Sequence, residues 1–134
     1  MYAFGRAKAL GVDIEHIRAD IDVLKLAAHT FSPREVEVLA SVPAQQRTNA
    51  FFRCWTRKEA YVKARGEGLS IPLDSFSVSF LENEVPGLVD HQGDPSETER
   101  WTIHDVSQSP ETIAAVVAEG RGWQSLYFRW PLGG

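Results

Sequence analysis

The sequence contains a single cysteine, Cys54, among its 134 residues. One cysteine cannot form a disulfide within the chain, so we expect a buried thiol in a reducing cytoplasm. The apolar runs fall far short of the roughly 18 residues needed to cross a bilayer, which predicts no membrane partner. The first residues also lack the long apolar stretch of a signal peptide. These absences predict a cytoplasmic protein.

The chain has no excess of basic residues. Lysine and arginine number 14 against 18 aspartate and glutamate, for a net charge of -4. Binding to nucleic acid through bulk charge is therefore not expected. The hydrophobic fraction of 43% is ordinary for a globular protein. Length and composition predict one domain, residues 1–134, with its own core.

Hydrophobic periodicity predicts an α+β fold in which helices pack on a mainly antiparallel sheet. Ser32 and Glu35 have the spacing of a capping box, and Gly66 is placed to end a long helix. The segment 86–99, rich in glycine, proline and aspartate, is expected to be a loop. Helices are predicted at 23–28, 33–41 and 44–65, and strands at 9–17, 76–80, 101–106, 113–118 and 126–130.

Two carboxylates alternate with apolar residues in the first predicted strand. Asp13 and Glu15 are two apart and should project from the same face, while Val12 and Ile14 face the core. Two neighbouring carboxylates repel each other unless a cation joins them, and oxygen ligands suit Mg²⁺. An ordinary solvated strand face is the alternative interpretation of this pattern.

Glu59 and Lys63 lie four apart on the long predicted helix, one turn after Trp55. At this spacing the two could form a common exposed ion pair. The aromatic residues of the same helix instead suggest that they border a packed surface. There a lysine suits a phosphate, and a carboxylate can complete a metal site or act as a general base.

Other familiar site patterns are missing. The four histidines, His16, His29, His91 and His104, show no metal-ligand spacing. The segment 66–68 matches neither common phosphate-binding loop, and no serine lies in a nucleophile elbow. The carboxylates and lysines therefore remain the candidates.

Together these segments resemble the 4′-phosphopantetheinyl transferases, specifically the larger, surfactin-synthetase-activating (Sfp-like) type. That family has a Gly-Ile/Val-Asp-Ile/Val-Glu strand, which 11–15 matches. About 40 residues later it has an aromatic-x-x-Trp-Thr-x-Lys-Glu-Ala/Ser-aromatic-x-Lys helix, which 52–63 matches, and a Gly-x-Gly-Leu ending, which 66–69 matches. The smaller holo-carrier synthase type lacks the Trp-Thr signature and fits less well.

The resemblance implies transfer of 4′-phosphopantetheine from coenzyme A to a serine of an acyl or peptidyl carrier protein, dependent on Mg²⁺. It implies that Asp13, Glu15 and Glu59 hold the metal ion. Glu59 would also take the serine proton, Lys63 would neutralise charge on the phosphates, and Lys58 would support coenzyme A binding. The stretch from 66 to about 81 would be the docking face for the carrier protein.

The resemblance extends over nearly the whole chain, but only over the C-terminal half of the two-lobed family. The half-length match suggests an isolated half, a homodimer that rebuilds the cleft, or a pair with a separate partner half. One competing hypothesis is a non-catalytic half-domain that binds a carrier protein or a complementary half. Another is a different Mg²⁺-dependent enzyme acting on phosphate compounds.

Overall fold

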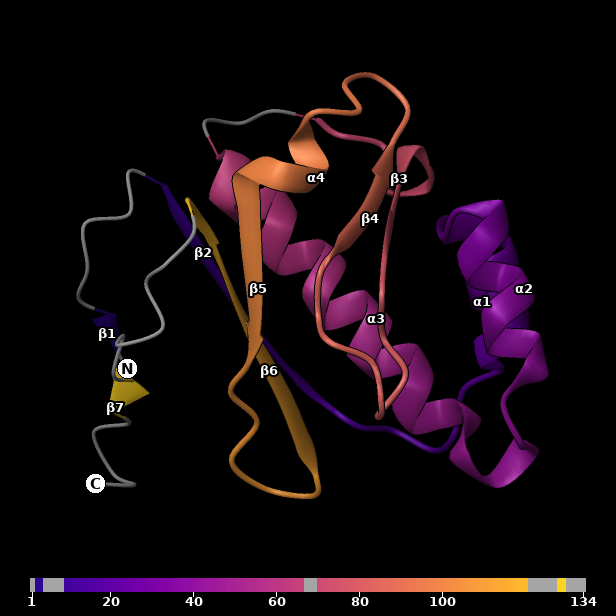
Figure 1. Cartoon of the computed structure of the whole chain (residues 1–134). Helices are drawn as coiled ribbons and strands as arrows, with labels where there is room; N and C mark the ends of the chain where they lie inside the picture. The colour runs from indigo at the N-terminus through magenta and orange to yellow at the C-terminus, as the bar shows by residue number, and fades with distance from the viewer. Residues whose placement is uncertain (1, 4–8, 67–69, 121–127, 130–134) are drawn as a thin grey trace.

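The computed structural model describes residues 2–3, 9–66, 70–120 and 128–129 (Figure 1). The helices are α1 (Val23–Thr30), α2 (Pro33–Ser41), α3 (Ala44–Arg65) and α4 (Glu97–Arg100), with one 3₁₀ turn at Leu73–Ser75. The strands are β1 (Tyr2–Ala3), β2 (Leu10–His16), β3 (Phe76–Val78), β4 (Leu88–His91), β5 (Trp101–Asp105), β6 (Thr112–Glu119) and β7 (Phe128–Arg129).

The main sheet has three strands in the order β2-β6-β5, and both pairings are antiparallel. In its register Asp13 lies opposite Ala115, and Ala115 lies opposite Asp105. Strands β3 and β4 form a separate antiparallel pair with an irregularity between Ser77 and Val78, and β1 pairs with β7. The expected α+β fold with a mainly antiparallel sheet is confirmed.

Helix α3 is the central element of the fold. Figure 1 shows it running beside the main sheet, with the β3–β4 pair near its middle and α1 and α2 grouped beyond its N-terminal half. It contacts β2 and β6 most extensively, and it also touches β3, α1 and α2. Phe51, Tyr61, Ile103 and Val117 are among the buried residues that join helix and sheet in one core.

The expected helix boundaries follow from local capping. The Ser32 hydroxyl accepts the Glu35 amide at 3.2 Å, and the Glu35 carboxylate accepts the Ser32 amide at 2.9 Å. This is the predicted capping box at the start of α2. Helix α3 ends before Gly66, whose φ of 60° is readily adopted by glycine alone.

The predicted orientation of β2 is wrong in one respect. Asp13 and Glu15 do share a face, but that face packs against α3, and Asp13 is only 5% exposed. Ile14, expected in the core, is 47% exposed, and Leu10 is 38% exposed on the same outward face. The alternation of a strand fixes which residues share a face, whereas the packing of α3 decides which face is covered.

The segment 86–99 is not the loop that its composition suggested. It contains β4, which pairs with β3, and most of the short helix α4. Pairing with Phe76–Val78 supplies backbone hydrogen bonds that a short segment cannot secure alone. Most of the strand predicted at 126–130 lies outside the described residues, which include only 128–129. Over the described ranges no helix is both long and apolar enough to cross a membrane.

Candidate functional site

A close contact between β2 and α3 brings the predicted site residues together. A Cβ atom on Gly11 would lie 2.1 Å from the Ala60 carbonyl oxygen and 2.3 Å from the Ala64 amide nitrogen. Only glycine therefore lets the strand lie directly against the helix backbone. Asp13 and Glu15 follow this contact on the same face of β2, and so reach the side of α3 that carries Glu59 and Lys63.

Asp13 and Lys63 form the central ion pair. The Lys63 ammonium donates to Asp13 Oδ1 at 2.6 Å. Asp13 is buried, whereas the Lys63 side chain is 52% exposed, so the ammonium lies between the carboxylate and solvent. The hydrogen bond to Asp13 is the main cause that raises the pKa of Lys63. Asp13 Oδ2 is buried and has no hydrogen-bond partner among the described residues.

Glu15 lies beside this pair and is held by the long helix. The Trp55 indole N–H donates to Glu15 Oε2 at 3.3 Å. Burial first, and the neighbouring Asp13 carboxylate second, raise the pKa of Glu15 to about 7. A carboxyl group that titrates near neutral pH can both hold and release a proton under ordinary conditions.

Glu59 completes the cluster. Burial and the Asp13 carboxylate raise the pKa of Glu59, while Lys63 opposes the shift. Glu59 therefore shares one electrostatic environment with Asp13, Glu15 and Lys63. We refer to these four residues as the β2–α3 cluster.

The β2–α3 cluster fits a hard cation by its chemistry. Three carboxylates face one ammonium, so the negative charge is only partly compensated, and Asp13 Oδ2 lacks a donor. Within the part of the chain that the structure describes, no group of three acidic, histidine or cysteine side chains is close enough to form a preassembled metal site. A divalent ion would therefore need the carboxylates to move closer together.

Lys58 belongs to a different network. It is fully buried, and its ammonium donates to Glu35 Oε1 at 2.7 Å and to the Phe76 carbonyl. The same ammonium lies 4.0 Å from the centre of the Phe76 ring, and Glu35 also accepts the Val78 amide. These contacts join α2, α3 and β3. The prediction that Lys58 contacts coenzyme A remains untested, and this burial does not favour it.

An apolar hollow of about 530 Å³ opens beside the β2–α3 cluster. Glu15 and Trp55 line it on the side of the cluster, and Ile14, Phe51 and Phe52 are among its apolar lining residues. A substrate group in this hollow would therefore lie next to the Glu15 carboxylate.

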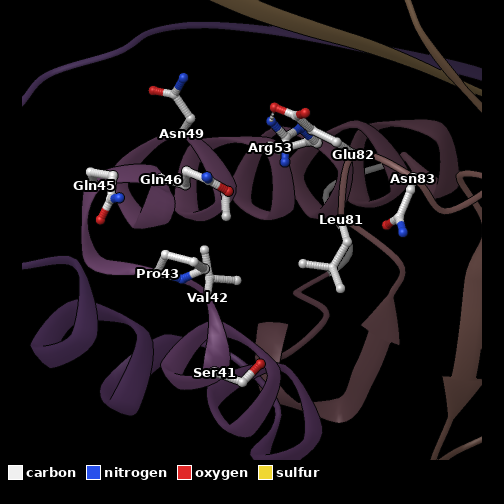
Figure 2. A pocket seen from close by; sticks show the side chains of 11 residues that line it. Ser41, Val42, Pro43, Gln45, Gln46, Asn49, Arg53, Leu81, Glu82 and Asn83 are labelled. Carbon is white, nitrogen blue, oxygen red and sulfur yellow. Dashed lines mark ion pairs between the residues drawn. The ribbon is translucent and has the colours of Figure 1, made fainter.

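A second hollow, of about 440 Å³, lies along the N-terminal half of α3 and shares no lining residue with the β2–α3 cluster (Figure 2). Figure 2 shows Arg53 of α3 facing Glu82, and their charged groups are 3.5 Å apart. Gln46 and Asn49 line the same hollow along the helix. No pattern in the sequence indicated this hollow.

Two contacts around the site were also not predicted from the sequence. The Trp55 indole donates to Glu15 across 40 positions of the chain. The buried carboxylate of Glu97 accepts hydrogen bonds from Tyr61 and Arg65, which flank Lys63. Glu97 lies in a segment without hydrophobic periodicity, so no sequence pattern could indicate this contact.

The fold of the chain is shared with solved holo-(acyl-carrier-protein) synthases. The Thermotoga maritima structure matches with a TM-score of 0.62 and 22% identity, covering 86% of this chain and 65% of that one. The Bacillus anthracis structure, a complex with CoA (3′,5′-ADP), matches with a TM-score of 0.58 and 21% identity, covering 84% and 96%. At these identities the likeness concerns the fold alone.

Sequence relatives come from the same group of enzymes. The 4′-phosphopantetheinyl transferase HetI of a Nostoc species is 34% identical over 128 residues, which are 96% of this chain and 51% of that protein. The transferase Sfp of Bacillus subtilis is 38% identical over 72 residues, 54% of this chain and 31% of Sfp. The match thus spans about half of the Nostoc relative and about a third of Sfp. A model of the 4′-phosphopantetheinyl transferase superfamily matches residues 9–118. The chain therefore belongs to the 4′-phosphopantetheinyl transferase superfamily.

Proposed function

We propose that this chain takes part in the Mg²⁺-dependent transfer of 4′-phosphopantetheine from coenzyme A to a serine of an acyl or peptidyl carrier protein. The observation that carries the proposal is the β2–α3 cluster. In a member of this superfamily, it places three carboxylates around one lysine beside an open hollow. The free, fully buried Cys54 is compatible with the reducing cytoplasm in which we place the reaction.

Asp13, Glu15 and Glu59 are the residues that would hold Mg²⁺. Bound there, the ion would supply positive charge to the pyrophosphate of coenzyme A. The unpaired Asp13 Oδ2 supports this assignment. Burial and, after it, the Asp13 carboxylate raise the pKa of Glu15, and a cation between the two carboxylates would relieve their repulsion.

The chain's own residues would position and neutralise the reacting groups. The serine oxygen forms a bond to the phosphorus that carries the pantetheine arm, and the bond from that phosphorus to adenosine 3′,5′-bisphosphate breaks. Glu59 accepts the serine proton, directly or through water. The half-exposed Lys63 ammonium is close enough to the carboxylates to stabilise charge on the phosphate oxygens.

We further propose that the chain acts as the C-terminal half of a surfactin-synthetase-activating type of enzyme. The 38% identity to Sfp over 72 residues supports this type. A second copy or a complementary partner half would then supply the other wall of the cleft. Leu10 and Ile14, exposed on the outward face of β2, support such an apolar contact.

A transfer assay tests the proposal. The protein is incubated with coenzyme A, Mg²⁺ and an apo carrier protein, and the carrier is weighed by mass spectrometry. We expect the carrier to gain the mass of one phosphopantetheine arm, and chelation of the metal to abolish the gain. Sfp serves as the positive control for the carrier preparation. If Sfp modifies the carrier and this chain does not, the chain is not active on its own.

The Glu59→Gln variant tests the site within the same assay. It keeps the shape of the side chain and removes its charge, so we expect turnover to fall by at least about 100-fold. Stability should change little, because among the described residues Glu59 forms no ion pair and loses only the electrostatic attraction of Lys63. Glu37→Gln, on the exposed face of α2, is the matched control and should keep full activity. Unchanged turnover in Glu59→Gln would remove Glu59 from the proposed chemistry.

The main alternative is a non-catalytic half-domain that binds a carrier protein or a partner half. The apolar residues Leu10 and Ile14, exposed on β2, favour it, because they offer a surface to a partner. This alternative predicts carrier binding without affinity for coenzyme A, which calorimetry can measure. Mg²⁺-dependent binding of coenzyme A to the chain would contradict it.

A further inference from the structure

Glu97 is a buried carboxylate that the proposed chemistry does not use. It lies at the start of the short helix α4, between β4 and β5, and is 1% exposed. Its Oε1 accepts the Tyr61 hydroxyl, the Arg65 guanidinium at 2.7 Å and the Trp101 indole at 3.0 Å. Its Oε2 accepts Arg100 at 2.7 Å. A buried carboxylate so fully satisfied is a strong and directional anchor.

Two of these donors belong to the last turns of α3. Tyr61 precedes Lys63 by two residues, and Arg65 follows it by two. Residues two apart on an α-helix differ by roughly 200° around the axis. Glu97 therefore holds the side of α3 opposite to the one from which Lys63 reaches Asp13.

The same turns are fixed on their other side by β2. Gly11 places the strand against the backbone of Ala60 and Ala64 with no space for a Cβ atom. Helix α3 ends immediately afterwards, at Arg65. The end of the helix is thus held between β2 and Glu97, and the position of the Lys63 ammonium depends on both contacts.

Glu97 remains charged in this setting. Burial opposes its ionisation, but the hydrogen bonds from Tyr61 and Trp101 and the two guanidinium groups lower the pKa of Glu97. The carboxylate keeps its counter-charges at neutral pH, so removing its charge would leave Arg65 and Arg100 without their shared partner.

We propose that Glu97 is a positioning residue, which holds the last turn of α3 so that the Lys63 ammonium stays on the Asp13 carboxylate. The expected effect of Glu97 on turnover rests on the proposed transferase function. Its effect on the position of the Lys63 ammonium does not. Glu97 acts through Lys63 and touches no reacting group.

A double-mutant cycle separates this role from a general contribution to folding. In the wild-type background, Glu97→Gln should lower kcat by up to about 100-fold, since small displacements of a catalytic group have effects of this size. The KM for the carrier protein should stay unchanged. In a Lys63→Met background, measured by single-turnover transfer, the same substitution should change the rate by less than about twofold. Equal losses in both backgrounds would overturn the proposal.

Arg100→Gln is the matched control. It removes the ion pairs of Arg100 with Glu97 and with Glu119, and leaves the contacts between Glu97 and α3 in place. Turnover should stay within about twofold of wild type, because Glu97 Oε1 keeps its contacts with Tyr61 and Arg65 on α3. Thermal unfolding must show that every variant is folded at the assay temperature. A loss in Arg100→Gln equal to that in Glu97→Gln would show that the network is merely structural.

A second readout does not require transferase activity. Acetic anhydride acetylates exposed lysines, and mass spectrometry of peptides gives the ratio of labelling at Lys63 to labelling at the exposed Lys25. The contact with Asp13 should keep this ratio low in wild type, and Glu97→Gln should raise it several-fold. If the wild-type chain transfers nothing, activity of the chain on its own fails and this ratio alone decides the inference. An unchanged ratio would then overturn it.

Discussion

Asp13 influences every other residue of the β2–α3 cluster and is its most buried member. Burial is the first cause of the raised pKa of Glu15 and of Glu59, and the Asp13 carboxylate adds to both shifts. The hydrogen bond to Asp13 is the main cause of the raised pKa of Lys63. Burial and Asp13 together thus make the two acids harder to ionise, and Asp13 makes the lysine harder to neutralise. These directions favour binding of a divalent cation, since a cation would relieve the repulsion among all three acids.

The raised pKa of Glu15 predicts how stability depends on pH in metal-free buffer. Glu15 has a pKa near 4.5 when unperturbed and about 7 in the folded chain. Between these values the folded state binds more protons than the unfolded state, so this contribution to stability is complete below pH 4.5 and is lost as pH rises towards 7. Urea unfolding at several pH values measures the trend. The Glu15→Gln variant should show a smaller loss of stability over this window, and an identical loss would contradict the prediction.

At the scale of elements, the contact between β2 and α3 is what assembles the cluster. Because Gly11 has no side chain, the strand can lie directly against the helix backbone. Hydrogen bonds from Trp55 and Lys63 to the strand's carboxylates join the two elements. The far side of the helix is fixed by Arg57, which donates to the Ser79 carbonyl and pairs with Asp105 at 3.1 Å. Contacts therefore hold α3 on more than one side in the turns that precede Glu59 and Lys63.

We expect Gly11→Ala to disrupt this contact. The new methyl group would meet backbone atoms of α3 at 2.1–2.9 Å, and backbone cannot be displaced as cheaply as a flexible side chain. The substitution should lower the free energy of unfolding by about 1–3 kcal/mol and reduce turnover, because the strand must move away from the helix. Gly87→Ala is the matched control, since nothing lies within 4 Å of its added Cβ. Equal stabilities of the two variants by urea unfolding would refute the close-contact argument.

At the scale of the whole molecule, the chain buries its acidic strand face and exposes its apolar one. Leu10 and Ile14 point away from α3, on an edge strand of the main sheet. An exposed apolar surface on a sheet edge favours association with another protein surface. This exposed face supports the proposed contact with a second copy or a partner half.

The solution mass tests this association. We expect wild-type protein to sediment as a species heavier than the 15.0 kDa chain, and coenzyme A to increase the heavier fraction. Leu10→Lys should shift the population towards a single chain, because it places a charge on the outward face of β2. Val85→Lys, in the exposed loop before β4, is the control and should leave the mass distribution unchanged. A wild-type mass of one chain at all concentrations would exclude the homodimer and leave a separate partner half.

Much of the fold could be predicted because its signals are local. The capping box of Ser32 and Glu35 and the terminating Gly66 act within a few residues, and both were found as expected. The strand β4 and the helix α4 could not be predicted. Each is stabilised by distant partners, β4 by pairing with β3 and α4 by the contacts of Glu97 with α3.

The sequence by itself determined which chemical groups the site contains and how they are spaced along one strand and one helix. Period two put Asp13 and Glu15 on one face, and helical spacing put Glu59 and Lys63 on one side of α3. Only the tertiary structure decided that the acidic face of β2 is the buried one, and that the Lys58 ammonium pairs with the Glu35 carboxylate. The physical reason is that periodicity fixes relative directions within an element. Which direction is covered depends on the packing partner, and here the absent side chain of Gly11 allows α3 to cover the carboxylates.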